Sequence, residues 1–165
     1  MDALRLIRTR RSVRRFKKAR IPDAAIEKIL EAARWAPSGL NNQPWRFMVL
    51  EKDQKDVLAD FTHYSYIVRG ADKVILVFLD RNESYNYAKD IMAIGACIQN
   101  MLLYIHASGL GACWLGEILN KRKEIARILT ISSNLELEAV IALGKPGPRP
   151  KRGSRKKLNR LVIPL

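Results

Sequence analysis

Apolar residues recur along this chain with two different periods, which predict a series of helices and strands. A spacing of three or four residues is typical of a helix with one buried face, whereas an uninterrupted apolar run suits a strand buried on both faces. Helical spacing predicts helices over 2–9, 23–36, 53–68 and 121–129. Pro22 and Asp23 favour the start of the second helix, and Pro37 ends it. A continuous apolar run predicts a strand over 73–79, and shorter or alternating apolar patterns predict strands over 45–50, 112–115 and 135–143.

The stretch 87–108 differs from the other predicted helices because it has almost no polar face. Within 91–105, only Gln99 and Asn100 are strongly polar. A helix that is apolar on nearly every side has no face for solvent, so it must lie in the middle of the structure. In a chain of 165 residues, we expect a subunit interface to provide part of its surroundings. Gly109 follows the helix, as expected for a residue in the left-handed conformation that ends it.

The order of these elements predicts a single α+β domain over residues 1–165. The chain has no internal repeat, and its length suits one hydrophobic core. We expect a mixed central sheet flanked by helices. Beyond Gly144 the periodic pattern stops, so residues 145–165 are predicted to form an extended tail.

Charge and cysteine content indicate the partners and the compartment. Lys and Arg number 30 against 16 Asp and Glu, which gives a formal net charge of +14. Nine basic residues lie within 5–20, and seven lie within 149–160. This charge attracts phosphate on a nucleotide, a nucleic acid or a membrane, and it does not select among them. Two cysteines make no disulfide framework, and the sequence shows neither a signal peptide nor an apolar run of 18 residues. We therefore expect a cytoplasmic protein without a membrane anchor.

The segment Arg10-Arg11-Ser12-Val13-Arg14 is the first candidate binding site. Guanidinium groups hold a phosphate through paired, charge-assisted hydrogen bonds, and a neighbouring serine adds a further donor or acceptor. The alternative is a solvated basic face at the end of the first helix, where cations favour the negative pole of the helix dipole. The motif alone does not separate these two interpretations.

The polar loop Pro37-Ser38-Gly39-Leu40-Asn41-Asn42-Gln43-Pro44-Trp45 is the second candidate. Carboxamides and hydroxyls are costly to bury without partners, so three carboxamides and a serine in one loop suggest a planar polar ligand bonded at several points. A nucleotide cofactor, and in particular a flavin, fits this description. The alternative is a turn whose side chains satisfy its own backbone. Gln43 disfavours the turn because glutamine has no turn preference, and Trp45 is expected in the core.

The third candidate is the segment Gly109-Leu110-Gly111-Ala112-Cys113-Trp114-Leu115-Gly116. Its glycines follow a helix and precede a strand, the reverse of the order in dinucleotide-binding sites, so that motif is excluded. Gly116 ends the strand, where a residue without a side chain lets backbone N–H groups approach a ligand. The residues without a partner at metal-ligand spacing are expected to be structural: Cys97, Cys113, His63 and His106. No metal site is expected, and an enzyme with so few reactive groups must obtain its chemistry from a cofactor.

Together and in this order, the segments resemble the nitroreductase family of FMN-dependent oxidoreductases. The matching stretches are 10–16, 36–45 and 99–116, and the similarity extends from about residue 4 to residue 157. The resemblance implies an intertwined homodimer with two flavins at the interface and with the helix at 91–105 as the central contact. It also implies that the tail crosses to the partner, where Leu161-Val162-Ile163 adds an edge strand.

The resemblance further implies which residues bind FMN. The phosphate and the adjoining ribityl chain would be held by residues from both ends of the chain: Arg10, Arg11, Ser12, Arg155 and Lys156. Arg14 would approach the pyrimidine edge of the flavin. The partner subunit would contribute residues of the polar loop: Pro37, Ser38 and Asn41. Residues at the strand end would lie along the ring near N5 and act through their backbone: Leu115, Gly116 and Glu117.

The implied activity is hydride transfer from NADH or NADPH through flavin N5 to nitroaromatics, quinones or similar small acceptors, in a ping-pong cycle. The chain lacks the family's lid insertion before Gly109, and the stretch 152–157 lacks the prolines usual around the phosphate-binding arginine. One alternative is specialised chemistry of the same family, such as reductive dehalogenation or flavin breakdown. Another is a nucleic-acid-binding module, which the absence of aromatic residues from the basic tail disfavours.

Overall fold

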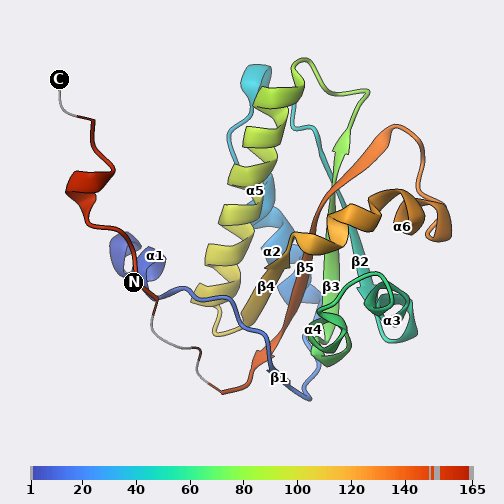
Figure 1. The fold of residues 1–165 in the computed structure, drawn as a ribbon, viewed down its shortest axis with the longest axis horizontal. Helices are drawn as coiled ribbons and strands as arrows, with labels where there is room; N and C mark the ends of the chain where they lie inside the picture. Colours follow the sequence, from blue (N-terminus) through green and yellow to red (C-terminus); the bar gives the residue numbers. More distant parts are fainter. Residues whose placement is uncertain (1, 149, 151–152, 164–165) are drawn as a thin grey trace.

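The computed structural model describes residues 2–148, 150 and 153–163. Figure 1 shows a central sheet with helices on both faces and a tail that leaves the body of the protein beside the first helix. In chain order the elements are α1 (Ala3–Thr9), β1 (Phe16–Lys17), α2 (Asp23–Arg34), η1 (Gly39–Asn41), β2 (Trp45–Glu51), α3 (Asp53–Ala59), α4 (Ser65–Gly70), β3 (Lys73–Asp80), α5 (Tyr87–Ala107), β4 (Gly111–Leu115), η2 (Glu117–Lys121), α6 (Arg122–Ile128), β5 (Leu135–Pro146) and η3 (Leu158–Arg160).

Strand β5 organises the sheet because it pairs with three other strands. It is antiparallel to β3 on one side, and to β4 and then β1 on the other, while β2 pairs with the outer edge of β3. The predicted α+β class is confirmed. Among the described residues, parallel pairing occurs at one isolated bridge, between Ser12 and Ala112. The sheet is therefore mixed only through this bridge, which joins the arginine-rich segment to the start of β4.

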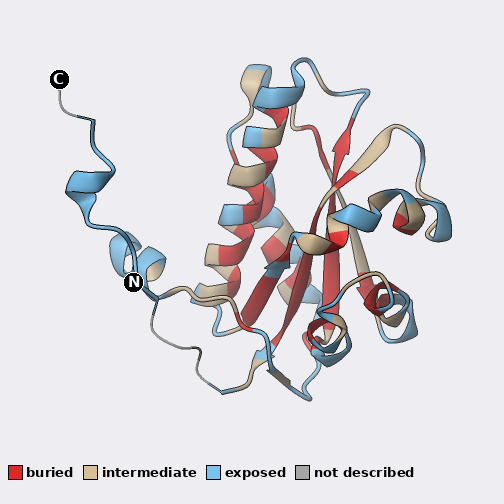
Figure 2. Ribbon diagram, in the orientation of Figure 1, coloured by how far each residue is buried: buried red, intermediate tan, exposed pale blue. Residues whose placement is uncertain are grey.

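Strand β3 shows why the sheet has a core on each face. Every one of its residues is buried, and successive side chains of a strand point to opposite faces. Ile75, Val77 and Leu79 pack with α2 and α5, whereas the alternate residues of the strand pack with α3, α4 and α6. This confirms the prediction of a strand buried on both faces, and Figure 2 shows the buried strands between the two helical layers.

Helix α5 is the longest element, with 21 residues. Its length and apolar composition would suffice to cross a membrane, but the residues on its inner side belong to the core that it shares with α2. The opposite side is not covered within one chain: Figure 2 shows it as intermediate and exposed, and Met92 there is 73% exposed. The helix is thus central to the core, as predicted, and it also presents an uncovered apolar surface.

The predicted single helix over 53–68 is wrong: the chain forms two helices, α3 and α4, with a turn between them. Thr62 stabilises this turn, because its hydroxyl accepts the N–H of Tyr64 (3.1 Å) and donates to Glu117 (2.7 Å). The break lets both helices bury apolar residues against the same face of the sheet. Two other expectations are confirmed: Gly109 has a φ of 71° after α5, and Trp45 is buried.

The two ends of the chain also differ from the expected pattern. The two-residue strand β1 was missed because its basic, half-exposed sequence has no apolar periodicity. In the tail, a short 3-10 turn forms at η3, and Leu161, Val162 and Ile163 are exposed rather than paired in a strand. They form no strand within one chain, so strand addition to a partner stays a prediction.

Candidate functional site

The arginine-rich segment after α1 is fixed to the sheet by Val13. The backbone N–H of Val13 donates to the carbonyl of Ala112 (2.8 Å), and the Val13 side chain is buried. A Cβ on Gly111 would lie 2.8 Å from Cβ of Val13, closer than carbon atoms pack. Glycine at 111 therefore lets the segment lie directly on the end of β4. This attachment presents Ser12 and Arg14 at the surface on either side of Val13.

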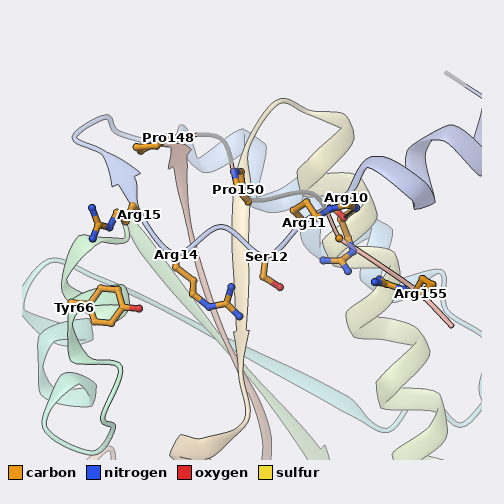
Figure 3. A pocket seen from close by; sticks show the side chains of 10 residues that line it. Arg10, Arg11, Ser12, Arg14, Arg15, Tyr66, Pro148, Pro150 and Arg155 are labelled. Carbon is orange, nitrogen blue, oxygen red and sulfur yellow. Dashed lines mark hydrogen bonds between the residues drawn. The ribbon is translucent and has the colours of Figure 1, made fainter.

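A hollow of about 820 Å³ lies over this segment. Figure 3 shows Arg10 and Arg155 at one end, Arg15 and Tyr66 at the other, and Ser12 and Arg14 between them. The lining residues come from the segment, α4 and the tail: Arg10, Arg11, Ser12, Arg14, Arg15, Tyr66, Pro148, Pro150, Gly153 and Arg155. Its volume is in the range of about 300–1,000 Å³ that is usual for cofactor and small-molecule sites.

Residues from the two ends of the chain meet at the Arg10 end of the hollow. Gly153 lies against Arg11, because a Cβ at this glycine would be 3.0 Å from the guanidinium Nε. Arg155 is close enough to Arg10 to affect its ionisation: burial, then the charges of Arg155 and Arg11, lower the pKa of Arg10 below its usual value. Arg10 and Arg155 therefore lie close together, whereas their joint contact with a phosphate stays a prediction. Lys156 is exposed and does not line the hollow.

The charges of the hollow are not balanced by the protein. In the part of the chain that the structure describes, none of its five arginines forms a salt bridge with a carboxylate. By contrast, Arg46, Arg81 and Arg122 each pair with an acidic residue. Guanidinium groups gathered without counter-charges repel one another, and a phosphate would relieve that repulsion through charge-assisted hydrogen bonds. The donor set therefore suits a phosphorylated ligand.

The polar loop lies far from this hollow within one chain. The side-chain amide of Asn42 donates to the carboxylate of Asp90 (2.9 Å), near the start of α5. Thr9, next to Arg10, contacts His106 (3.0 Å) near the end of α5. Sixteen residues separate Asp90 from His106, which corresponds to roughly 24 Å at ~1.5 Å per helical residue. Pro37, Ser38 and Asn41 therefore cannot reach the same small ligand as Arg10 of their own chain.

Part of the polar loop stabilises its own conformation. The Ser38 hydroxyl accepts the N–H of Gln43 (3.0 Å), and the Gln43 amide donates to the carbonyl of Asn41 (3.3 Å). The alternative of a self-satisfied turn thus holds for Ser38 and Gln43, whereas Asn42 donates outside the loop, to Glu83 and Asp90. Asn41 is different: its side chain is exposed and makes no hydrogen bond to any described residue. Its φ of 54° places it in the left-handed region, which asparagine tolerates.

Leu115, Gly116 and Glu117 lie at the far end of β4 from Ala112 and do not line the hollow. Leu115 is buried in the core, so it could contact a ligand only through its backbone, as predicted. A Cβ at Gly116 would meet nothing within 4 Å, which leaves open space above this backbone. The Glu117 carboxylate accepts from Thr62 (2.7 Å) and lies 3.8 Å from His63. Contact of these three residues with a flavin stays a prediction.

The remaining reactive side chains do not form a second site. Burial raises the pKa of the Cys97 thiol to about 12 and also raises that of Cys113, so both thiols stay protonated. Burial, then Arg10 and Arg11, lowers the pKa of His106. His63 is exposed and is not the structural residue that we expected. Within the described residues, no group of three His, Cys, Asp or Glu side chains could hold a metal.

Sequence reasoning missed five residues that line the hollow: Arg15, Tyr66, Pro148, Pro150 and Gly153. Arg15 continues the arginine run, so the run itself could have indicated it. Tyr66 comes from α4, distant in sequence, and only the fold brings it to the segment. No local pattern marks it.

Comparison with known proteins identifies the family. The sequence profile of the Nitroreductase family matches residues 7–65 and 61–145. A protein of Methanothermobacter thermautotrophicus named "Putative NADH dehydrogenase/NAD(P)H nitroreductase" is 33% identical over 153 residues, which cover 91% of this chain and 80% of that protein. The iodotyrosine deiodinase of Thermotoga neapolitana is 28% identical over 173 residues, with 88% of this chain and 90% of that protein covered.

A solved structure is more similar still. The crystal structure of a "putative nitroreductase" from Desulfovibrio desulfuricans, in complex with FMN, is 47% identical and has a TM-score of 0.96. The match covers 100% of this chain and 98% of that chain. The resemblance that the three motifs carry is thereby confirmed: the chain belongs to the nitroreductase family, a family of oxidoreductases.

Proposed function

We propose that this protein is an FMN-dependent oxidoreductase that uses NADH or NADPH to reduce small acceptors such as nitroaromatics and quinones. The observation that carries the proposal is the arginine-lined hollow, whose five guanidinium groups lack carboxylate partners among the described residues. The complex of FMN with a protein 47% identical to this chain supports the choice of cofactor.

The residues of the hollow fit FMN from its phosphate to its ring. Arg10, Arg11 and Arg155 would hold the phosphate, because guanidinium groups bond phosphate oxygens in pairs. Ser12, next along the hollow, would bond the ribityl side, with Lys156 available to the phosphate from the exposed tail. Arg14 would face the pyrimidine edge, where its positive charge favours the reduced, more negative flavin.

A second copy of the chain would complete the site. Pro37, Ser38 and Asn41 lie too far from Arg10 within one chain, and the uncovered side of α5 provides an apolar surface for a partner. In a symmetric homodimer, the loop of each subunit would reach the hollow of the other. The exposed residues at 161–163 would then pair with the partner's sheet edge.

When bound, FMN would supply the redox chemistry, which is hydride transfer from NAD(P)H through N5 to the acceptor in a ping-pong cycle. The chain's own groups would bind and orient the flavin. The backbone at Leu115, Gly116 and Glu117 would lie along the ring, and the open space at Gly116 leaves room for the ring. Neither cysteine supplies a thiolate, since both are buried and protonated. We place the enzyme in the cytoplasm.

Reductive dehalogenation is the second candidate, because the relative from Thermotoga neapolitana is named an iodotyrosine deiodinase. It would use the same hollow and the same cofactor. A nucleic-acid-binding function gains no support, since the arginines of the first segment gather in a hollow rather than on a flat surface. One experiment should therefore compare nitroaromatic and quinone acceptors with a halogenated acceptor.

Anaerobic stopped-flow reduction tests the proposal. Protein loaded with FMN is mixed with NADH or NADPH while absorbance of the flavin is followed, and then with a nitroaromatic, a quinone or iodotyrosine. We expect bleaching by at least one nicotinamide and recovery of absorbance by the nitroaromatic or the quinone. Recovery by iodotyrosine alone would favour dehalogenation. Protein that retains no FMN, or bound flavin that neither nicotinamide reduces, would contradict the proposal.

A further inference from the structure

Tyr66 lies at the opposite end of the hollow from Arg10 and Arg155 (Figure 3). It belongs to α4, whose Ile67 and Val68 are fully buried in the core. These two residues fix the short helix on the sheet, so the adjacent Tyr66 is held on its outer side. The Tyr66 side chain is 53% exposed, although it is large and aromatic. A helix anchored in this way presents Tyr66 to the hollow from a defined direction.

The Tyr66 hydroxyl has no hydrogen-bond partner among the described residues. Two other exposed tyrosines, Tyr85 and Tyr87, do have local contacts. Tyr87 donates to Glu136 (3.4 Å) and lies 4.6 Å from the guanidinium of Arg81, and the ring of Tyr85 covers Gly39. In Figure 3 the Tyr66 hydroxyl points to the side on which Arg14 lies. Tyr66 is thus the one aromatic side chain among the described residues that line the hollow, and its hydroxyl is free to bond a ligand.

The two ends of the hollow suit the two ends of a flavin nucleotide. Arg10, Arg11 and Arg155 concentrate charge at one end, where a phosphate would lie. The ring would then extend toward Arg14 and Tyr66. Its pyrimidine edge carries carbonyl and ring nitrogen groups that need hydrogen-bond partners when water is displaced. A guanidinium and a phenol hydroxyl are donors for such groups.

Resting on the proposed function, we infer that Tyr66 is a cofactor-contact residue whose hydroxyl donates a hydrogen bond to the pyrimidine edge of the flavin, beside Arg14. The negative charge of the reduced flavin is concentrated at this edge. A donor there stabilises the reduced form more than the oxidised form, because a hydrogen bond to a charged acceptor is stronger. Tyr66 therefore adds to both the affinity for FMN and the reduction potential of the bound flavin.

The test compares Tyr66→Phe with Tyr64→Phe in the full chain. Each variant loses one exposed hydroxyl near α4, and Tyr64 does not line the hollow. For Tyr66→Phe we expect FMN to bind about 2- to 10-fold more weakly. We also expect a more negative two-electron midpoint potential; a tenfold loss of preference for the reduced form corresponds to about 30 mV. Tyr64→Phe should match the wild type in both quantities, and both variants should keep the wild-type thermal stability.

The outcomes separate this inference from the proposed function. Wild-type protein that binds no FMN would overturn both. Wild-type protein that binds and is reduced, with Tyr66→Phe unchanged in affinity and potential, would overturn the inference alone. Equal changes in Tyr66→Phe and Tyr64→Phe would also overturn it, because the effect would then arise from α4 rather than from contact. A change of affinity and potential confined to Tyr66→Phe would support it.

Discussion

Arg10 is half-buried between the guanidinium groups of Arg11 and Arg155, and its pKa is lowered by burial and by those two charges. The position is unfavourable in the protein alone, because like charges in a partly desolvated site repel. The same arrangement favours a dianionic phosphate, which turns three repelling groups into three donors. The arrangement of these three arginines therefore favours ligand binding and does not stabilise the protein alone.

Replacing Arg10 tests this adaptation. Arg10→Ala should weaken FMN binding by roughly 10- to 100-fold, because it removes a charge-assisted contact of about 1.5–3 kcal/mol. Arg20→Ala is the control: Arg20 is an arginine too, but it is exposed and pairs with Asp23 (3.7 Å) outside the hollow. Titration of each apoprotein with FMN, followed by flavin fluorescence, measures both affinities. Equal affinities in the two variants would remove Arg10 from the phosphate site.

The sequence was informative for site residues that are consecutive in the chain. Arg10, Arg11, Ser12 and Arg14 were predicted as a group, and the hollow contains all four. Tyr66 could not be predicted, because it reaches the hollow only through the packing of α4 on the sheet. The roles of Asn42 and Ser38 within the loop were likewise hidden, since they depend on contacts with Asp90 and Gln43.

Among the elements, β4 and the segment that follows α1 form one unit. Ser12 pairs with Ala112, and Val13 lies directly over Gly111. The position of the arginines therefore depends on a close backbone approach that only glycine permits. The break between α3 and α4 likewise positions a residue of the hollow, because it sets where α4 presents Tyr66.

The Gly111 contact gives a prediction for a residue that touches no ligand. Gly111→Ala should force the segment away from β4, with an overpacking cost of about 1–3 kcal/mol and a lower affinity for FMN. Gly70→Ala is the control, because a Cβ at Gly70 would meet nothing within 4 Å. Thermal unfolding and FMN titration of both variants check this. A Gly111→Ala protein with wild-type stability and FMN affinity would contradict the role given to this contact.

Strand β5 carries an ionisable group whose effect on stability has a defined sign. Burial, then the charge of Glu136, raises the pKa of Glu138 from 4.5 to about 7, and Glu138 Oε1 has no hydrogen-bond partner among the described residues. The folded state therefore holds this proton more tightly than the unfolded state. The stabilisation is fully present below pH 4.5 and is lost as the pH rises to about 7.

Glu138→Gln should therefore stabilise the protein above pH 7, by about 1–3 kcal/mol, and have little effect below pH 4.5. Urea unfolding at the two pH values measures the difference. Glu136→Gln is the contrasting variant and should destabilise, because Glu136 pairs with Arg81 (2.6 Å) and Arg122 (2.8 Å). A loss of stability in Glu138→Gln that is the same at both pH values would show that the ionised Glu138 carboxylate does not destabilise the folded state.

The sequence predicted some helices and strands accurately and missed others, and each outcome has a physical reason. Strongly apolar stretches such as β3 and α5 were placed to within a residue or two, because burial fixes their pattern. The turn at Thr62 was missed, since helical periodicity continues on both sides of it. Strand β1 was missed because its pairing with β5 is set by the close approach of neighbouring segments and not by its own side chains.

In the whole molecule, the two groups of expected cofactor residues lie near opposite ends of α5. Asn42 is bonded near its start, and Thr9 contacts its last turn. The exposed side of α5 and the exposed apolar residues of the tail are both consistent with a second subunit. A homodimer would bring the loop of one chain to the hollow of the other, which a monomer cannot do.

Subunit exchange tests this arrangement. Arg10→Ala and Asn41→Ala homodimers should each bind FMN weakly, because each lacks one partner in both sites. In a heterodimer of the two, one site carries both substitutions and the other carries neither. Mixing the variants should therefore restore one strong FMN site per heterodimer, as measured by FMN titration after exchange. No recovery, although mass spectrometry shows heterodimers, would mean that the two residues do not serve the same site across the interface.

In the proposed enzyme, the arginine hollow would bind the phosphate of a flavin nucleotide. Calorimetric titration of the apoprotein with FMN and with riboflavin, which lacks only the phosphate, tests it most directly. We expect FMN to bind tighter than riboflavin by on the order of 100-fold, since two or more charge-assisted contacts depend on the phosphate. Equal affinity for FMN and riboflavin would contradict it.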